Sequence, residues 1–598
     1  MTAALTPVPK IQFFADDGTP LVGGKLYSYA AGTTTPLATY TTYAGTVANT
    51  NPVILDSRGE ANVWLGANVY KLALYDADNA LIWTVDNITP EGDAALVSYL
   101  PAGTGAVITT VQAKLRESVS VKDFGAVGDG VTNDTAAIQA AITASTGKEL
   151  IFPAGYTFLS GPLTASTAMT IRIDGVLKMK DLTGVLLTIT ASDVTVYGAG
   201  TVDLNSTQDK GIQNTGNRFH IYGLTFANML GGAATSGSSS ALAIASCQSP
   251  RVHDLKFNNI QKGTALAPFV SQPRAMSFDI VTNMLVSDIL CENVFVAAGV
   301  ASVEDSTFSN ITVNSTLLTV DNCFYAITAK RCVFNNIVIR GWEGEPIVFS
   351  GCEDVSFFGG EINNWNQNSC GFENCTDIAI DGMRFVSNRE STIIKSRTAN
   401  TTTSGVTLRN LYVKVSGIDD IIGFYNGTVN NILIQNCIFI PTIAVGANIN
   451  NRFLTLTSTD SFAITDNTFI LQETSAGVAA AAEWNTTLVA TQYSDFKRNT
   501  FINRTTNGRL RILGTENNLI SSDGLHNQSN ITGSRNPNYG LATAEPRRFF
   551  GTAIPSAGTF IRGDIILSTA PAAGATPGWV CTTAGTPGTW KAMANLAP

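Results

Sequence analysis

Hydrophobic and polar positions alternate with period two along most of the chain, a pattern that predicts short β-strands rather than helices. Near the N-terminus, Lys25–Tyr29 and Val69–Tyr75 alternate in this way, and turn sequences rich in Asp, Asn and Gly separate them. These runs predict a small antiparallel β domain over residues 1–97. Residues 98–117, which begin with a Pro- and Gly-containing stretch, are expected to form a linker or neck.

A loose repeat dominates the rest of the chain. Apolar phrases recur at intervals of 23 to 32 residues, and their last apolar residues are Ile362, Phe385, Val413, Phe439, Phe469 and Phe501. A period of this size, rich in Val, Ile, Phe and Asn, is typical of a solenoid. Helical repeats are excluded because the units alternate at period two, and leucine-rich repeats are disfavoured because Leu does not hold the required positions. The predicted fold class is therefore all-β: a right-handed parallel β-helix over residues 118–540, with a small N-terminal antiparallel β domain and a small C-terminal β domain over residues 541–598.

The cap and turn signals along the chain agree with this fold. An open solenoid end needs a cap, and a helix expected from Thr135 to Ser145 stands where the N-terminal cap belongs. Three glycines between residues 125 and 130 precede it, but their order does not match a dinucleotide-binding fingerprint, so a tight turn is favoured over a phosphate site. Asn pairs predict turns with left-handed backbone angles and ladders between rungs: Asn258–Asn259, Asn335–Asn336 and Asn430–Asn431.

Composition limits the classes of partner and cofactor. The formal net charge is −9 and charged residues make up 14% of the chain, which argues against a nucleic-acid partner. Nine dispersed cysteines without a C-x-x-C pair, and only three histidines, argue against a zinc site or a disulfide framework. We therefore expect reduced, mostly buried cysteines, no metal and no cofactor. The sequence contains no recognisable secretory signal and no long apolar run, so we expect synthesis in a cytoplasm and no membrane insertion.

Two regions carry a family resemblance. Val121–Ile142, which reads VKDFGAVGDGVTNDTAAIQAAI, resembles the opening segment of the pectate-lyase-like β-helix superfamily. Pro52–Glu60 and Tyr70–Asp76 resemble the virion-attachment domain of tailed-phage tailspikes. The combination resembles a phage tailspike depolymerase. This resemblance implies a homotrimer in the virion that is attached to the phage tail or baseplate through residues 1–97 and that binds and cleaves capsular polysaccharide, O-antigen or exopolysaccharide. It implies no active-site positions, because the family shares no single catalytic motif.

Three kinds of chemistry remain open. Hydrolysis by carboxylates that flank the glycosidic bond is favoured. β-Elimination on a uronic-acid polymer, which needs a base and neutralisation of the sugar carboxylate, is the first alternative. A non-catalytic adhesin or an esterase is the remaining one, because a fold alone does not fix a function.

Candidate catalytic acids come from one strand aligned across rungs. The aligned phrases are Ser277–Ile280, Thr319–Cys323, Val348–Cys352 and Gly371–Cys375. Alternation then predicts that Asp279, Asp321, Ser350 and Glu373 point outward in one column. Asp321 and Glu373 would lie about 9.6 Å apart, at the upper edge of the spacing for inverting hydrolysis. Glu343 and Glu345, which enter the Ser350 strand, are candidates for a closer second carboxylate.

The sequence signals for sugar-binding residues are less specific than those for the acids. Trp342 and Trp365 stand in polar turn sequences, so we expect exposed rings that stack on sugars, with packing over a turn as the alternative. Arg274 is a candidate contact to an acidic glycan, and a solvated outward side chain is the alternative.

Overall fold

The structure is a computed structural model. It describes residues 4–5, 10–88, 94–95, 97–181, 184–206, 210–231, 239–262, 272–315, 322–342, 344–363, 365, 369–387, 393–396, 402–416, 421–424, 428–443, 452–459, 462–473, 483–490, 494–504, 509–514, 519–521, 548–558 and 560–596. The chain divides into two compact units, Met1–Val119 and Ser120–Pro598.

The first unit is built around an antiparallel sheet in the order β5–β3–β8–β9, in which β3 (Lys25–Ala30) pairs with β8 (Tyr70–Tyr75). The alternation predicted both segments as strands. The sheet buries one apolar face around Val63, Leu65 and Leu74. Helix α1 (Val111–Leu115) follows. The other strands of this unit are β1 (Ala4–Leu5), β2 (Ile11–Gln12), β4 (Thr39–Tyr40), β5 (Val53–Ile54), β6 (Glu60–Ala61), β7 (Trp64–Leu65), β9 (Leu81–Ile88), β10 (Ser98–Tyr99), β11 (Thr109–Thr110) and the start of β12 (Ser118–Ser120).

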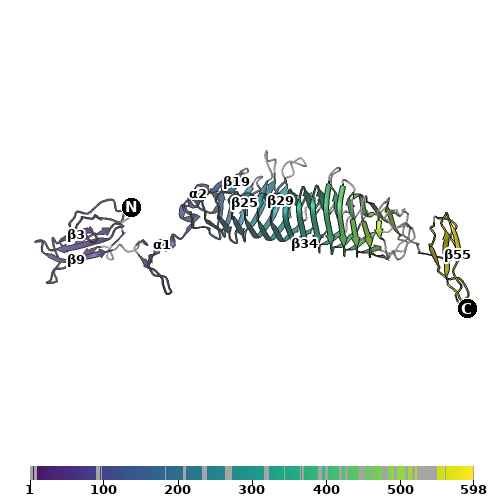
Figure 1. The fold of residues 1–598 in the computed structure, drawn as a ribbon. Helices are drawn as coiled ribbons and strands as arrows, with labels where there is room; N and C mark the ends of the chain where they lie inside the picture. Colours follow the sequence, from purple (N-terminus) through teal and green to yellow (C-terminus); the bar gives the residue numbers. More distant parts are fainter. Residues whose placement is uncertain are drawn as a thin grey trace. The chain divides into compact units, whose positions relative to one another are not determined.

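The second unit contains a right-handed parallel β-helix, which confirms the predicted fold class (Figure 1). Forty strands form one continuous ladder from β12 to β51 (Leu519–Ser521). The repeat predicted from the sequence matches the register of this ladder. Ile362 pairs with Phe385, and the pairing continues through Val413, Phe439, Phe469 and Phe501. The apolar phrases therefore mark successive rungs.

Three outward faces wind around the β-helix. Face C comprises β25 (Ser240–Gln248), β27 (Arg274–Thr282), β29 (Val296–Glu304), β31 (Phe324–Ile327), β33 (Ile347–Ser350) and β35 (Cys370–Glu373). Face A comprises β23 (His220–Tyr222), the first parts of β26 (Arg251–Lys262), β28 (Leu285–Val294), β30 (Thr307–Asn314), β32 (Lys330–Arg340) and β34 (Glu353–Asn363), and then β36 (Thr376–Asp381), β39 (Thr402–Arg409), β42 (Thr428–Gln435) and β45 (Phe462–Thr465). Face B comprises the second parts of the long strands, and then β37 (Arg384–Ser387), β40 (Tyr412–Ser416), β43 (Ile438–Ile443) and β46 (Thr468–Glu473).

The remaining strands of the ladder continue these faces toward its two ends. They are β13 (Asp129–Asn133), β14 (Glu149–Phe152), β15 (Thr157–Ser160), β16 (Leu163–Ala165), β17 (Thr170–Ile173), β18 (Val176–Met179), β19 (Val185–Ile189), β20 (Thr195–Tyr197), β21 (Thr201–Asp203), β22 (Lys210–Asn214), β24 (Thr225–Gly231), β38 (Ile394–Ser396), β41 (Ile422–Phe424), β44 (Arg452–Thr459), β47 (Glu483–Ala490), β48 (Ser494–Lys497), β49 (Thr500–Arg504) and β50 (Arg509–Gly514).

The N-terminal end of the β-helix carries the predicted helix. A 3₁₀ turn (Val121–Phe124) leads into the glycine turn, and α2 (Thr135–Ala144) follows it with Ile138 and Ile142 buried. The carboxylate of Asp134 accepts the backbone N–H groups of Val127 and Gly128 at 2.7 and 3.0 Å. A carboxylate therefore already fills this turn, which confirms a structural turn rather than a phosphate site.

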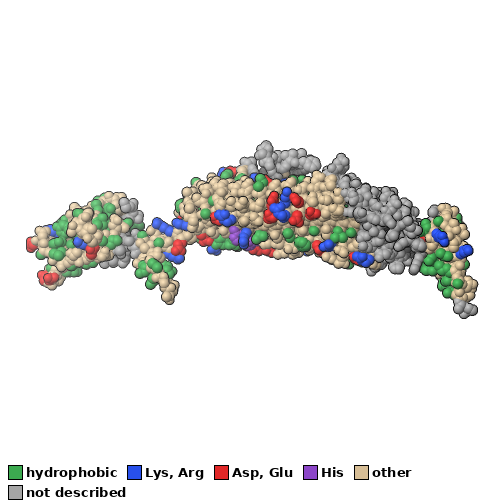
Figure 2. All heavy atoms as spheres, in the orientation of Figure 1, with side chains coloured by type: hydrophobic (Ala, Val, Ile, Leu, Met, Phe, Trp, Pro, Cys, Tyr) green, Lys and Arg blue, Asp and Glu red, His purple; other side chains and the backbone are tan. Residues whose placement is uncertain are grey.

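Stacked apolar side chains fill the interior. Phe308, Phe334 and Phe357 stack on consecutive rungs with ring centroids 4.6 and 4.7 Å apart. All nine cysteines are buried and unbridged, as predicted. The turns also follow the prediction, because Asn259, Asn336 and Asn431 adopt positive φ angles of 57°, 52° and 53°. Outside, acidic and basic side chains gather together on the middle of the β-helix in the view of Figure 2.

A four-stranded sheet closes the described chain. It comprises β52 (Arg548–Gly551), β53 (Ile565–Ser568), β54 (Gly578–Thr583) and β55 (Thr589–Ala592), around Ile566, Cys581 and Trp590. Among the described residues of the whole chain, no helix has the length and apolar character that a membrane span requires.

Candidate functional site

The predicted column of acids lies on face C. Register pairs carry the outward row from Asp279 through Ala301 and Ile327 to Ser350 and Glu373. Asp279 is exposed and Glu373 is half-buried. Asp279, Ser350 and Glu373 therefore share one outward row, as the alignment predicted.

The member of the row between Asp279 and Ser350 was predicted wrongly. Ile327, and not Asp321, pairs with Ser350, because the phrase that ends in Cys323 precedes strand β31 instead of forming it. Asp321 and Glu343 themselves lie outside the described residues. Asp279 and Glu373 are separated by four rung steps, or about 19 Å at ~4.8 Å per step. This separation is about twice the upper limit for a hydrolytic carboxylate pair.

Glu345 does not join the row either. Its side chain is 8% exposed, and its carbonyl oxygen accepts the Cys323 N–H at 3.2 Å. Glu345 lies before the start of β33 (Ile347–Ser350), whereas Ser350 is the last residue of that strand. The acids predicted from the sequence therefore do not form a close carboxylate pair among the described residues.

Both tryptophans are buried, and the expectation of exposed stacking platforms is wrong. Trp342 and Trp365 are 0% exposed. Trp365 packs edge-on against Phe385 at 6.3 Å between centroids, and its carbonyl accepts the Ser387 hydroxyl at 3.1 Å. Polar neighbours in the sequence indicate a turn, but they do not determine which way the turn directs a side chain.

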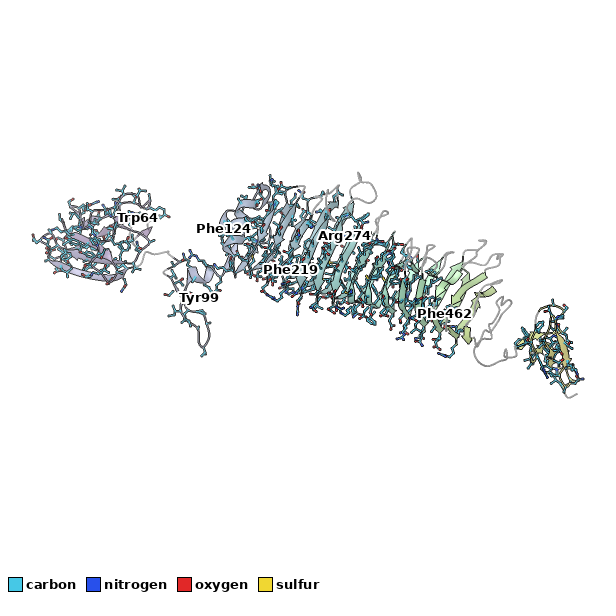
Figure 3. The ribbon with its side chains drawn as sticks, turned by 45° about the horizontal axis from the view of Figure 1, so that its top comes forward. Trp64, Tyr99, Phe124, Phe219, Arg274 and Phe462 are labelled. Atoms are coloured by element: carbon cyan, nitrogen blue, oxygen red, sulfur yellow. The ribbon has the colours of Figure 1, made fainter. Side chains whose placement is uncertain are left out.

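Arg274 begins β27 and is half-buried (Figure 3). Its guanidinium lies over Gly299 on the next rung, where a Cβ atom would stand 2.5 Å from Nη1. A side chain at Gly299 would therefore displace Arg274. Contact between Arg274 and a substrate stays a prediction.

Two aspartates that the alignment missed lie at the corner between faces C and A, which we call corner CA. Glu353 pairs with Thr376 and Val355 pairs with Ile378, so Asp354 and Asp377 occupy neighbouring rungs, about 4.8 Å apart at their backbones. Both are exposed, with positive φ angles of 53° and 54°. The signal was present in the sequence, because Cys-x-Asp followed by Val or Ile recurs after 23 residues, at Cys352–Val355 and Cys375–Ile378.

The environment of this pair differs from that of the acids beside it. Arg331 donates to Asp305 at 2.6 Å and to Glu304 at 3.0 Å, and the hydrogen bond from Arg331 lowers the pKa of Asp305. Lys330 pairs with Glu353 at 3.1 Å. Within the described residues, neither Asp354 nor Asp377 forms an ion pair. Oδ1 of Asp377 lies over Gly405 on the next rung.

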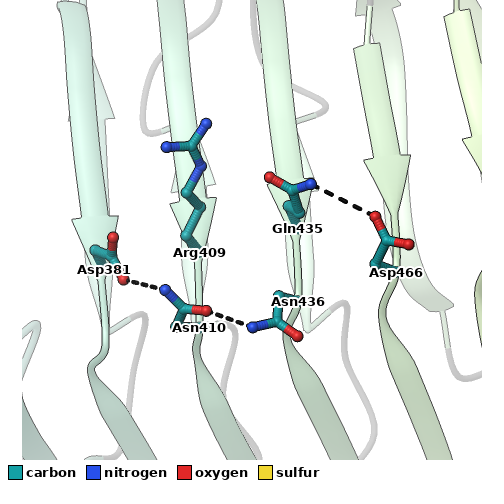
Figure 4. Close-up of a pocket in the computed structure, with 6 residues that line it drawn as sticks. All are labelled: Asp381, Arg409, Asn410, Gln435, Asn436 and Asp466. Atoms are coloured by element: carbon teal, nitrogen blue, oxygen red, sulfur yellow. Dashed lines mark hydrogen bonds between the residues drawn. The ribbon is translucent and has the colours of Figure 1, made fainter.

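A hollow of about 540 Å³ lies where face A meets face B (Figure 4). Asp381, Arg409 and Gln435 occupy consecutive outward positions on three neighbouring strands. The corner residues below them complete the lining, namely Asn410, Asn436 and Asp466.

Hydrogen bonds order the polar groups of this hollow. Asn410 donates to Asp381 at 2.7 Å, and Asn436 donates to Asn410 at 2.6 Å. A two-point hydrogen bond from Arg498, at 2.6 and 2.8 Å, lowers the pKa of Asp466 to about 2. Within the described residues, the Arg409 guanidinium forms no ion pair. The hollow therefore offers carboxylate acceptors beside free guanidinium donors, a combination that suits hydroxyl groups.

A second polar cluster lies on face A near the N-terminal end. Tyr197, Tyr222 and His253 stack on successive rungs at 5.2 and 4.9 Å between centroids. His220 and His253 share a hydrogen bond of 2.7 Å between their Nε2 atoms. The rings cover one another's faces, so this ladder offers their edges rather than a flat surface for a sugar. Among the described residues, no group of three or more His, Cys, Asp or Glu is arranged to hold a metal.

The histidine pair predicts a dependence of stability on pH. Partial burial, and then the nearby His253 and Arg251, lower the pKa of His220 below 6.5. The unfolded chain therefore binds a proton at this residue before the folded chain does, and stability falls as the pH decreases below about 6.5. We expect the thermal midpoint to fall less between about pH 7 and pH 5 in His220→Gln than in the wild type. An equal fall in both proteins would contradict this role.

The chain is similar to a family model and to a phage protein. The family model described as "Rhamnogalacturonase A/epimerase, pectate lyase-like" matches residues 118–345. Depolymerase 1 of Klebsiella phage K5-2, described as specific for capsule K30/K69, is 40% identical over 97 residues. That stretch is 15% of this chain and spans 12% of the relative's length.

Solved structures of the tailspike of E. coli bacteriophage HK620 also align. A mutant in complex with a hexasaccharide gives a TM-score of 0.45 at 14% identity, and a mutant in complex with a pentasaccharide gives 0.42 at 15%. Each alignment covers 71% of this chain and 85% of the other. The family match and the phage relative support the resemblance to tailspike depolymerases that the two N-terminal signatures carried.

Proposed function

We propose that this protein is the tailspike of a tailed phage and that it binds and depolymerises a bacterial surface polysaccharide by hydrolysis. The observation that carries the proposal is the joint occurrence, in one chain, of a stretch 40% identical to a phage capsule depolymerase and a pectate-lyase-like β-helix. The surface supports it, because the strands form one continuous ladder and a hollow lined by polar side chains lies where face A meets face B. An elongated ladder of this kind suits a polymer better than a small metabolite.

The proposed chemistry uses carboxylates at corner CA. Asp354 and Asp377, on neighbouring rungs, act on one glycosidic bond, one as the acid that protonates the leaving oxygen and the other as the base or nucleophile. Glu373, from the predicted row, lies on the same rung as Asp377 and is the third candidate. The proposed acid–base chemistry uses these side chains alone, without a metal or a cofactor.

The proposed assembly follows the resemblance. The chain forms a homotrimer in the virion, and residues 1–97 attach it to the phage tail or baseplate. Support for this division of labour comes from the first unit, whose described interior is a compact apolar core. The β-helix, over residues 118–540, is the part that binds and cleaves the glycan.

The test is product analysis with a panel of purified Klebsiella capsular polysaccharides, including the two capsules named for the relative. We expect the purified protein to shorten one of them and to release new reducing ends without the ultraviolet absorbance of an unsaturated uronate. That absorbance would replace hydrolysis with β-elimination. Binding without shortening would make the protein an adhesin, and the absence of any binding would contradict the proposed function.

A further inference from the structure

A ladder of side chains runs along the corner between faces A and B, which we call corner AB. From Asp254 to Arg498 it is interrupted at two rungs. Asn310 donates to Asp288 at 3.0 Å, and Asn336 donates to Asn310 at 3.0 Å. The ladder resumes with Asn410 and Asn436. Between these two segments, the same left-handed position is occupied by Gly359 and Gly382, with φ angles of 64° and 70°.

Neither glycine is required by close packing. A Cβ atom at Gly359 would meet nothing within 4 Å, and one at Gly382 would meet only the backbone of Gly359, at 3.7 Å. Left-handed geometry does not demand glycine here either, because Asn holds the same conformation on the neighbouring rungs. The two glycines therefore leave an open notch, two rungs long, in a row that carries side chains from Asp254 to Asn336 and from Asn410 to Arg498.

An exposed aromatic ring stands beside the notch. Phe358, next to Gly359, is 43% exposed on face A. In the outward row it pairs with Asn335 on one side and with Asp381 on the other. Exposure of a large apolar side chain to water is unfavourable, so its place in a row of polar residues suggests a binding role. An exposed phenyl ring is a suitable platform for the C–H face of a sugar.

The notch continues into the hollow of Figure 4, because Asp381 is both the register partner of Phe358 and a lining residue of that hollow. Arg409 follows on the next rung. The charges of Asp381 and Arg409 balance, and those of Asp466 and Arg498 balance within their ion pair. The local field therefore favours neither an anionic nor a cationic ligand.

We propose that Phe358, the notch at Gly359 and Gly382, and the hollow beyond form one sugar-binding subsite for an uncharged pyranose residue of the polysaccharide. The sugar stacks on Phe358 with its edge in the notch, and its hydroxyl groups bind the carboxylate of Asp381 and the guanidinium of Arg409. This inference rests on the proposed function, because it assigns the subsite to the same polysaccharide.

The first test fills the notch. Gly359→Asn with Gly382→Asn restores the row of amides, and we expect the affinity for the capsular polysaccharide bound by the wild type to fall at least tenfold while the thermal midpoint is unchanged. Gly155→Asn is the matched control, because Gly155 has a φ of 82° and no atom within 4 Å of its Cβ position. Wild-type affinity in the filled variant would overturn the subsite.

The second test removes the platform. We expect Phe358→Ala to weaken binding about tenfold and Phe358→Trp to retain it, because stacking needs an aromatic face. Ile438→Ala is the control, since Ile438 is a 40% exposed apolar side chain on face B. If Phe358→Ala instead lowers the mass measured by light scattering, Phe358 belongs to a contact between subunits and the subsite is wrong.

The charge of the sugar is tested by Asp381→Asn. An uncharged sugar loses a strong acceptor, so binding weakens, whereas an acidic sugar loses a repulsion, so binding strengthens and the assignment is overturned.

The proposed function and the proposed subsite fail separately. If the wild type binds and cleaves the polysaccharide but none of these variants changes the affinity, only the subsite is wrong. If the wild type binds no polysaccharide of the panel, the proposed function is wrong and the subsite with it.

Discussion

Replacing Trp342 or Trp365 with alanine is expected to lower the free energy of unfolding by about 3–5 kcal/mol, the usual cost of removing a large aromatic side chain from a core. Both side chains are 0% exposed, so truncation leaves a cavity that the stacked rungs around it cannot readily close. Equilibrium unfolding in guanidinium chloride, followed by far-ultraviolet circular dichroism of the full chain, measures the effect.

The controls separate stability from binding. Trp→Phe at each position keeps most of the volume and is expected to cost less than Trp→Ala. Phe358→Ala removes an exposed ring, so its effect on stability is expected to stay within about 0.5 kcal/mol. If a Trp→Ala variant kept wild-type stability and lost affinity for the polysaccharide, the ring would be a sugar platform after all.

Asp354→Asn and Asp377→Asn are each expected to lower the turnover of the polysaccharide about 10²–10⁴-fold and to leave its affinity nearly unchanged. Removal of a general acid or base slows the chemical step, while the contacts that hold the glycan remain. The substitution is also structurally mild, because Asn tolerates the positive φ angles of 53° and 54° at these positions. Release of reducing ends measures turnover, and binding to immobilised polysaccharide measures affinity.

Other acids provide the contrast. Asp279→Asn changes an exposed acid about 19 Å from Glu373, so turnover is expected to stay near the wild-type value. Glu373→Gln tests the third candidate of corner CA. If Asp354→Asn and Asp377→Asn both keep wild-type turnover in folded protein, the catalytic pair lies elsewhere.

The sequence predicted the repeat correctly because the core of a β-helix constrains it at every rung. An inward position must be apolar to stack on its neighbours, so the apolar pattern alone aligns Ile362, Phe385 and Val413 as one column. The left-handed Asn turns are recognisable for a similar reason, because few residue types tolerate that conformation. Period two then indicates which residues of a strand point outward, as it did for Asp279 and Glu373.

Register across variable loops was decided only by the tertiary structure. Loops between strands differ in length, so a local phrase does not reveal which residues pair. The phrase that ends in Cys323 has the pattern of the aligned strands, but strand β31 begins one residue later, at Phe324. Turn residues also lie outside the period-two rule, so the inward direction of Trp342 and Trp365 came from packing alone. The sequence by itself determined the fold class, the repeat and the turns, because the core imposes them locally. The tertiary structure decided the pairing of Asp354 with Asp377 and the notch beside Phe358, because these depend on which rungs become neighbours.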